Sequence, residues 1–202
     1  MALATTDDNR AMQVLSVNVA LAQALATPGG EVASAIRKQP VDGPVEVRSL
    51  GLVGDEQADL SVHGGLAKAV YAYPVVHHAF WQTVRAQARV AAPGEPLPPG
   101  LFGENLALSG IDEGALWIGD RLEFPDCVLG VSEPRFPCFK FNAVMGFPKA
   151  AKLMVESGYC GAYLAVLSPG TITAGQSFAL VPGRREVGLR ELFRARTRGK
   201  SF

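Results

Sequence analysis

Residues 105–131, NLALSGIDEGALWIGDRLEFPDCVLGV, are the stretch that decides the expected fold. Its apolar runs are short, and turn-forming residues separate them; the runs lie at 105–108, 115–118, 121–124 and 127–131. Short runs bounded by glycine, proline and aspartate are typical of strands that follow one another closely. The stretch therefore predicts a β-rich fold rather than a regular alternation of strands and helices.

The rest of the chain extends this pattern. Further strand-like segments lie at 13–20, 45–47, 159–167, 177–181 and 68–73, the last of which ends at a proline. Apolar residues at helical spacing predict helices over 75–89, 149–157 and 186–196. The expected fold is mainly β with a few helices, arranged as a barrel rather than a doubly wound parallel sheet.

Composition limits the choice of function and compartment. The 202 residues suit one domain, and 19 basic against 19 acidic residues give a net charge of zero, which disfavours a nucleic-acid polymer as partner. No apolar run is long enough to span a membrane, and residues 1–11 are not expected to act as a secretory signal. The three cysteines show no metal or disulfide spacing, so a reducing, cytoplasmic location is expected.

Three parts are expected along the chain. Residues 1–11 form a loose tail, residues 12–182 form the β domain, and residues 183–202 form a short basic helix and tail. The last part is rich in arginine, which is typical of a solvated helix face. We expect its apolar residues to pack on the domain while its end stays in solvent.

The strongest local feature is the segment 134–141, PRFPCFKF. Two prolines stiffen it, and Cys138 lies close in sequence to Arg135 and Lys140. Nearby cations favour the thiolate, which attacks electrophiles and binds soft metals. The alternative is an inert buried cysteine, which is what the apolar settings of Cys127 and Cys160 predict for those two residues.

Two weaker motifs precede it. In the segment 54–68, the paired Gly64 and Gly65 would let backbone amides approach an anion, with His63 and Lys68 as further donors. A plain turn between strands explains the same residues. Glu104 and Asn105, in the segment 101–106, are placed to bind a pterin-like ring, or else to satisfy loop backbone.

Other enzyme signatures are missing from the sequence. It contains no zinc-ligand spacing, no phosphate loop of the Gly-x-x-x-x-Gly-Lys type and no Gly-x-Ser-x-Gly elbow. The neighbouring His77 and His78 lie in a predicted helix, where adjacent side chains point in different directions, so they do not suit one metal ion.

Taken in order, the motifs resemble the MOSC family, the domains related to the C-terminal part of molybdenum-cofactor sulfurase, and within it the stand-alone bacterial YiiM-type proteins. The resemblance spans about residues 12–182, and each motif is weak alone. It is carried by the segments 53–55, 58–59, 63–65, 68–74, 102–106, 118–120, 134–140, 163–167, 169–170 and 174–175.

The resemblance implies a MOSC-type β-barrel, similar to the barrel domain of pyruvate kinase, and a molybdopterin-type pyranopterin cofactor with molybdenum bound by the Cys138 thiolate. It also implies an enzyme that reduces N-hydroxylated compounds such as hydroxylaminopurines, a detoxifying reaction, with electrons from a separate flavin or iron–sulfur reductase. The residues assigned to the cofactor are His63, Gly64, Gly65, Lys68, Glu104, Arg135 and Lys140. Asp59 and Asn105 are expected near the metal or substrate.

Two alternatives stay open. Cys138 would serve equally well as a persulfide carrier that passes sulfur or cofactor to a client protein, because both roles need a reactive thiolate. A barrel without cofactor, acting as an interaction module, is the third reading. The chain also departs from the YiiM pattern, since only the short segment 186–196 remains where those proteins carry a further helical region, and the loop 91–100 is rich in proline.

Overall fold

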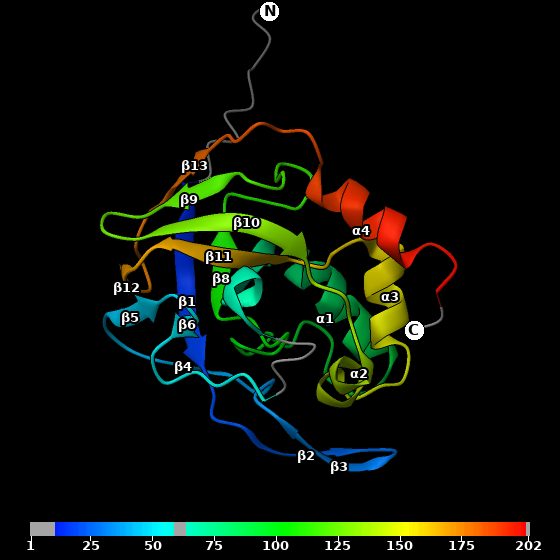
Figure 1. Ribbon diagram of the computed structural model, residues 1–202. Helices are drawn as coiled ribbons and strands as arrows, with labels where there is room; N and C mark the ends of the chain where they lie inside the picture. Colours follow the sequence, from blue (N-terminus) through cyan, green and yellow to red (C-terminus); the bar gives the residue numbers. More distant parts are fainter. Residues whose placement is uncertain (1–10, 59–63, 201–202) are drawn as a thin grey trace, which may run out of the picture.

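The computed structural model describes residues 11–58 and 64–200. Strands occupy one side of the molecule and the four α-helices the other (Figure 1). The predicted tail is therefore almost wholly outside the described residues, as are the site candidates Asp59 and His63. Within the described ranges no helix combines the length and the hydrophobicity that crossing a membrane requires.

An eight-stranded sheet forms the body of the fold. Its strand order is β13-β9-β10-β11-β7-β8-β1-β4, and it is mixed, since β7 and β8 run parallel while the other neighbours run antiparallel. In chain order the strands are β1 (Gln13–Val19), β4 (Gln39–Pro40), β7 (Val70–Pro74), β8 (Leu106–Ser109), β9 (Arg121–Glu123), β10 (Val128–Pro134), β11 (Ala162–Ser168) and β13 (Ala179–Val181).

The prediction of a mainly β fold with a few helices is confirmed, whereas the strand pairings among the described residues do not form a closed barrel. The two sides of the sheet nevertheless approach each other. Gln13 of β1 forms a bridge with Ser177, just before β13, and the Val14 N–H donates to the Gln176 carbonyl at 2.9 Å. The sheet therefore curves strongly and wraps around the core.

Two small sheets and several helices complete the fold. The small sheets are β12-β5-β6, from β5 (Val45–Arg48), β6 (Gly51–Leu52) and β12 (Gly170–Ile172), and the hairpin of β2 (Gln23–Thr27) and β3 (Gly30–Ser34). The helices are the 3-10 turns η1 (Leu66–Lys68) and η2 (Val75–His77), followed by α1 (His78–Gln87), α2 (Phe139–Met145), α3 (Ala150–Ser157) and α4 (Leu189–Thr197).

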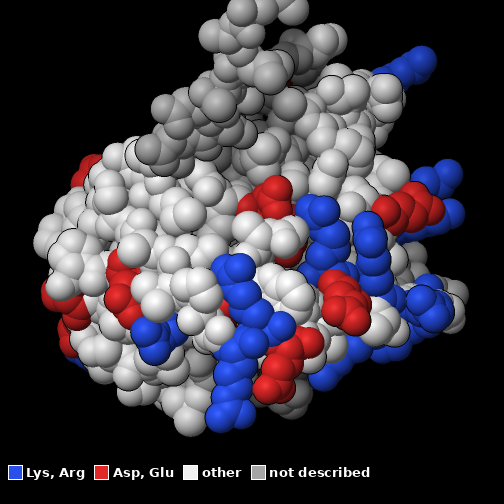
Figure 2. Space-filling model, turned by 90° about the horizontal axis from the view of Figure 1, so that it is seen from above, with Lys and Arg blue, Asp and Glu red and all other residues white. Residues whose placement is uncertain are grey.

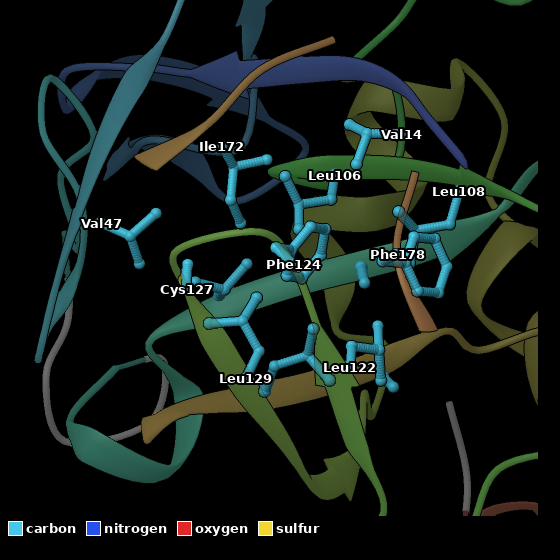
Figure 3. Packing of buried hydrophobic residues seen from close by; sticks show 14 of the residues in the cluster. Val14, Val47, Leu106, Leu108, Leu122, Phe124, Cys127, Leu129, Ile172 and Phe178 are labelled. Carbon is cyan, nitrogen blue, oxygen red and sulfur yellow. The ribbon is translucent and has the colours of Figure 1, made fainter. Parts of the chain in front are cut away.

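The main core lies inside the curved sheet. Side chains such as Leu106, Leu122 and Leu129 come from different strands and converge there, each nearly or completely buried (Figure 3). Cys127 belongs to this cluster and has no exposed surface. Burying each large aliphatic side chain contributes about 1.5–3 kcal/mol, so this cluster is a main source of stability.

A second, aromatic cluster joins the helices to the outer side of the sheet. Tyr73 on β7 stacks on Phe102 with ring centres 4.1 Å apart, and its hydroxyl accepts a hydrogen bond of 2.6 Å from Trp81 Nε1 on α1. Phe141 of α2 and Phe193 of α4 are fully buried in the same cluster. Because these rings hold α1, α2 and α4 on the sheet, they also fix the segment 134–140 that precedes α2.

The structure differs from the local predictions in three places. Residues 115–118 form turns instead of a strand, and Trp117 makes only a bridge with Gly188. The segment around Cys138 is a loop only as far as that residue, because α2 begins at Phe139. The β2–β3 hairpin was not predicted, since its apolar residues are sparse and its position depends on contacts with α2.

Candidate functional site

A cavity of ≈ 100 Å³ opens where the ends of several elements meet. Its wall combines the start of β7, the loop before β8, the end of the hairpin region and the segment that runs from β10 into α2. The lining residues that carry chemistry are Lys38, Asp55, Glu56, Lys68, Tyr71, Asn105, Arg135, Cys138, Lys140 and Tyr163.

Cys138 lines this cavity and caps the start of α2. It is half-buried, its backbone is extended, and its carbonyl accepts the Phe141 N–H at 2.9 Å. The other two thiols lie in the core, where burial raises the pKa of Cys127 to about 11 and raises that of Cys160 further above its ordinary value. Both therefore stay protonated, and Cys138 is the thiol placed for chemistry.

Arg135 supplies a fixed positive charge beside Cys138. Its guanidinium lies 4.7 Å from the ring centre of Phe141 and 5.3 Å from that of Tyr71, and the residue is only 4 % exposed. Burial acts to lower the pKa of Arg135, but Tyr71, Tyr163 and Cys138 act electrostatically to raise it, and the pKa ends above its ordinary value. Among the described residues no carboxylate lies within ion-pair distance of this guanidinium.

A buried ion pair that sequence reasoning missed forms another part of the wall. The Lys38 ammonium donates to Asp55 Oδ1, which also accepts the Ala20 N–H at 2.8 Å, and Asp55 Oδ2 accepts Asn105 Nδ2 at 2.9 Å. Burial lowers the pKa of Lys38, although Asp55 partly opposes this effect. Asp55 lies in a segment that carried the family resemblance, but no local pattern singled out Lys38.

Asn105 and Glu104 have different positions. Asn105 lines the cavity, and its side chain is engaged with backbone, since Oδ1 accepts the Tyr71 N–H at 3.0 Å and Nδ2 donates to the Asn18 carbonyl at 3.2 Å. Glu104 lies behind the wall at 1 % exposure, where its carboxylate accepts the N–H groups of Gly100 at 2.7 Å and Phe102 at 2.9 Å. The structure therefore places Asn105 at the cavity and uses Glu104 to hold the adjoining loop.

The remaining predicted cofactor residues are spread around the cavity. Lys140 lines it and donates from Nζ to the Ala33 carbonyl of the hairpin at 3.1 Å, while Lys68 lines it with Nζ 3.8 Å from Glu133. Gly64 and Gly65 are not lining residues, and the Gly65 N–H donates to the Gln57 side chain at 3.1 Å. Asp59 and His63 are outside the described residues, so the structure does not place them.

The charge of the wall indicates what it would hold. Four cationic side chains line the cavity against the two carboxylates of Asp55 and Glu56, which favours an anionic group. In the described ranges no three His, Cys, Asp or Glu side chains gather as a metal site. A metal bound here through Cys138 would need further ligands brought by its own cofactor.

Comparison with known proteins settles the family. The sequence model of the MOSC domain matches residues 59–179. The chain belongs to the MOSC domain family. This MOSC protein is 36% identical to the protein YiiM of Escherichia coli over 160 residues, which cover 78% of this chain and 68% of YiiM.

Two further likenesses extend this result. The crystal structure of YiiM from Geobacillus stearothermophilus superposes with a TM-score of 0.73 at 29% identity, covering 93% of this chain and 84% of that one. A protein of Gibberella moniliformis named "Reductase" is 40% identical over 156 residues, which cover 76% of this chain and 26% of the longer protein. The likeness to the two YiiM proteins identifies this chain as a YiiM-type MOSC protein.

Proposed function

We propose that this protein binds a molybdenum cofactor through Cys138 and reduces N-hydroxylated small molecules with electrons from a separate donor protein. The observation that carries the proposal is the half-buried Cys138 thiol in a cavity that four cationic side chains line. A thiolate is a suitable ligand for a soft metal, and cations suit the phosphate of a pyranopterin. The family and the relative named a reductase support the same reading.

The residues of the wall fit such a cofactor by their chemistry. Cys138 is the metal ligand, and Arg135, Lys68 and Lys140 are the candidates for the phosphate and pterin. Of these three side chains, Arg135 suits an anion best, because aromatic rings hold its guanidinium in place. Among the described residues, no carboxylate lies close enough to neutralise its charge. When bound, the cofactor supplies the exchange of electrons, and the protein supplies its anchorage and orientation.

The overall reaction takes up two electrons and two protons. The N–O bond of R–NHOH breaks, the nitrogen is reduced to the amine R–NH₂, and the oxygen leaves as water. Lys38 is placed to deliver a proton, since its ammonium lines the cavity and burial lowers its pKa. Asp55 holds this ammonium at the wall through the buried ion pair.

Metal and pterin analysis of protein made in a cofactor-competent host tests the proposal. The wild type should carry molybdenum and pterin and should reduce an N-hydroxylated amidine or purine when a chemical donor supplies electrons. Cys138→Ser replaces a soft ligand with a hard hydroxyl of nearly the same size, so folding should survive while metal and turnover are lost. Cys127→Ser is the matched control and should keep both, because Cys127 lies in the core.

Two outcomes would contradict this function. Wild-type protein without molybdenum and pterin would rule out the cofactor, and full activity of Cys138→Ser would rule out the ligand. Measuring the intact mass after treatment with a cysteine desulfurase distinguishes the reductase from the alternative function, a persulfide carrier. A gain of one sulfur atom on Cys138, in protein that carries no metal, would favour the carrier.

A further inference from the structure

Helix α4 packs directly on the segment that bears Cys138. Phe193, which is fully buried, stacks on Phe136 with ring centres 5.6 Å apart, and Phe136 is two residues before Cys138 in the chain. The start of the helix is held by backbone hydrogen bonds, because the Leu189 N–H donates to the Leu116 carbonyl at 2.9 Å. The helix is therefore a fixed outer wall next to the candidate site.

A groove runs between α4 and residues 113–117. Its volume is ≈ 470 Å³, and the side chains of Arg190, Arg194 and Arg198 line it at intervals of one helical turn, together with Trp117. Arg194 and Arg198 are exposed and have no ion-pair partner among the described residues. Figure 2 shows basic side chains gathered toward one side of the face that it draws, with acidic side chains among them.

The acidic residues near the groove only partly offset this charge. Glu113 is fully buried and already engaged, since its carboxylate pairs with His77 at 2.5 Å and accepts the Gly161 N–H at 2.7 Å. Glu191 is exposed at the rim, and Asp112 lies 4.0 Å from Arg190. The charge available to a partner is therefore positive, although the net charge of the whole chain is zero.

We propose that this arginine groove is the docking surface for an acidic electron-donor protein. The inference rests on the proposed function, in which a donor must deliver two electrons close to Cys138. Electron-transfer partners meet through small interfaces, where complementary charge speeds the encounter. A donor seated in the groove lies one helix away from the Cys138 segment, and an α-helix with its side chains is about 10–12 Å across.

A pair of matched double variants tests this surface. Arg194→Gln with Arg198→Gln removes two charges from the groove, and Arg48→Gln with Arg121→Gln removes two exposed charges from β5 and β9. The probe is an acidic flavodoxin, reduced by its own reductase, and reduced methyl viologen is the small chemical donor. Both are used with the full chain, and flavodoxin binding is also titrated directly at low and at moderate salt.

The groove variant should raise the flavodoxin KM and Kd about tenfold and weaken their salt dependence, with the methyl viologen rate unchanged. The control pair should behave like the wild type. Equal effects of the two pairs, or an unchanged Kd in the groove variant, would overturn the surface. If the protein binds heparin or DNA but does not bind flavodoxin, the groove is a general polyanion site, and the proposal is overturned. A wild type that is inactive even with methyl viologen would refute the proposed function, while the binding titration would still decide the surface.

Discussion

Glu104→Gln tests how the wall next to the candidate site is held. Burial raises the pKa of Glu104 from 4.5 to about 7, although the N–H groups of Gly100 and Phe102 and the charge of Arg135 oppose this shift. The folded protein therefore holds a proton on Glu104 over a pH range in which the unfolded chain has lost it. The resulting contribution to stability is fully present below about pH 4.5 and is lost as the pH rises through about 7.

The size of the effect follows from the shift. A difference of about 2.5 pKa units at about 1.36 kcal/mol each corresponds to about 3 kcal/mol. Glutamine does not titrate, so Glu104→Gln removes this pH dependence. The variant also loses one hydrogen bond, because its amide NH₂ group faces a backbone N–H where a carboxylate oxygen was the acceptor.

Denaturant unfolding at several pH values between 4.5 and 8 measures the effect. The free energy of unfolding of the wild type, minus that of Glu104→Gln, should fall by about 3 kcal/mol across this range. All other titrating groups are common to both proteins and cancel in the difference. Glu186→Gln, which removes an exposed carboxylate before α4, is measured alongside as the control for loss of a surface charge. A flat difference between the wild type and Glu104→Gln would refute the reasoning.

Four other changes have defined outcomes. Cys127→Ser should lower the free energy of unfolding, measured with denaturant, by about 1–3 kcal/mol, because the new hydroxyl lies in an apolar core. Cys160→Ser should lower it less, because its hydroxyl keeps the Gly161 carbonyl as a hydrogen-bond acceptor. Lys38→Met should lower the free energy of unfolding by about 3 kcal/mol, because it leaves the Asp55 carboxylate buried without its cation. An unchanged unfolding midpoint would show that the pair is not buried in solution. Ending the chain at Thr197 should leave the Tm almost unchanged, because residues 198–200 are exposed, and a large fall would show that the end is packed.

Most strands could be predicted because their signal is local. Short apolar runs with turn residues between them located β8, β9 and β10, and alternation located β1. Residues 115–118 carry the same apolar signal but form turns, because their partner is the chain at Val187 and Gly188 rather than a neighbouring strand. A local pattern does not tell which distant segment will supply the hydrogen bonds.

The residues of the site could likewise be predicted only where their signal is local. Cys138 and Arg135 stand out because a thiol, a cation and two prolines lie together in sequence. Lys38 does not, since its role depends on Asp55 and on the hairpin region that brings it to the wall. Glu104 and Asn105 are neighbouring polar residues whose roles the sequence does not distinguish. In the structure, Glu104 accepts hydrogen bonds from loop amides, whereas Asn105 faces the cavity, and only the packing around them decides this.

The segment 134–138 explains why the cavity and the groove on α4 belong together. Pro134 ends the pairing of β10 with β11, and Pro137 has no N–H to donate, so the chain between them leaves the sheet as a stiff loop. Within it Arg135 is held by the aromatic cluster, Phe136 stacks on α4, and Cys138 reaches the cavity. A shift of α4 would therefore act on Phe136 and, through a loop with little freedom, on the thiol. For this reason a partner bound along α4 would lie against a fixed support of the proposed metal ligand.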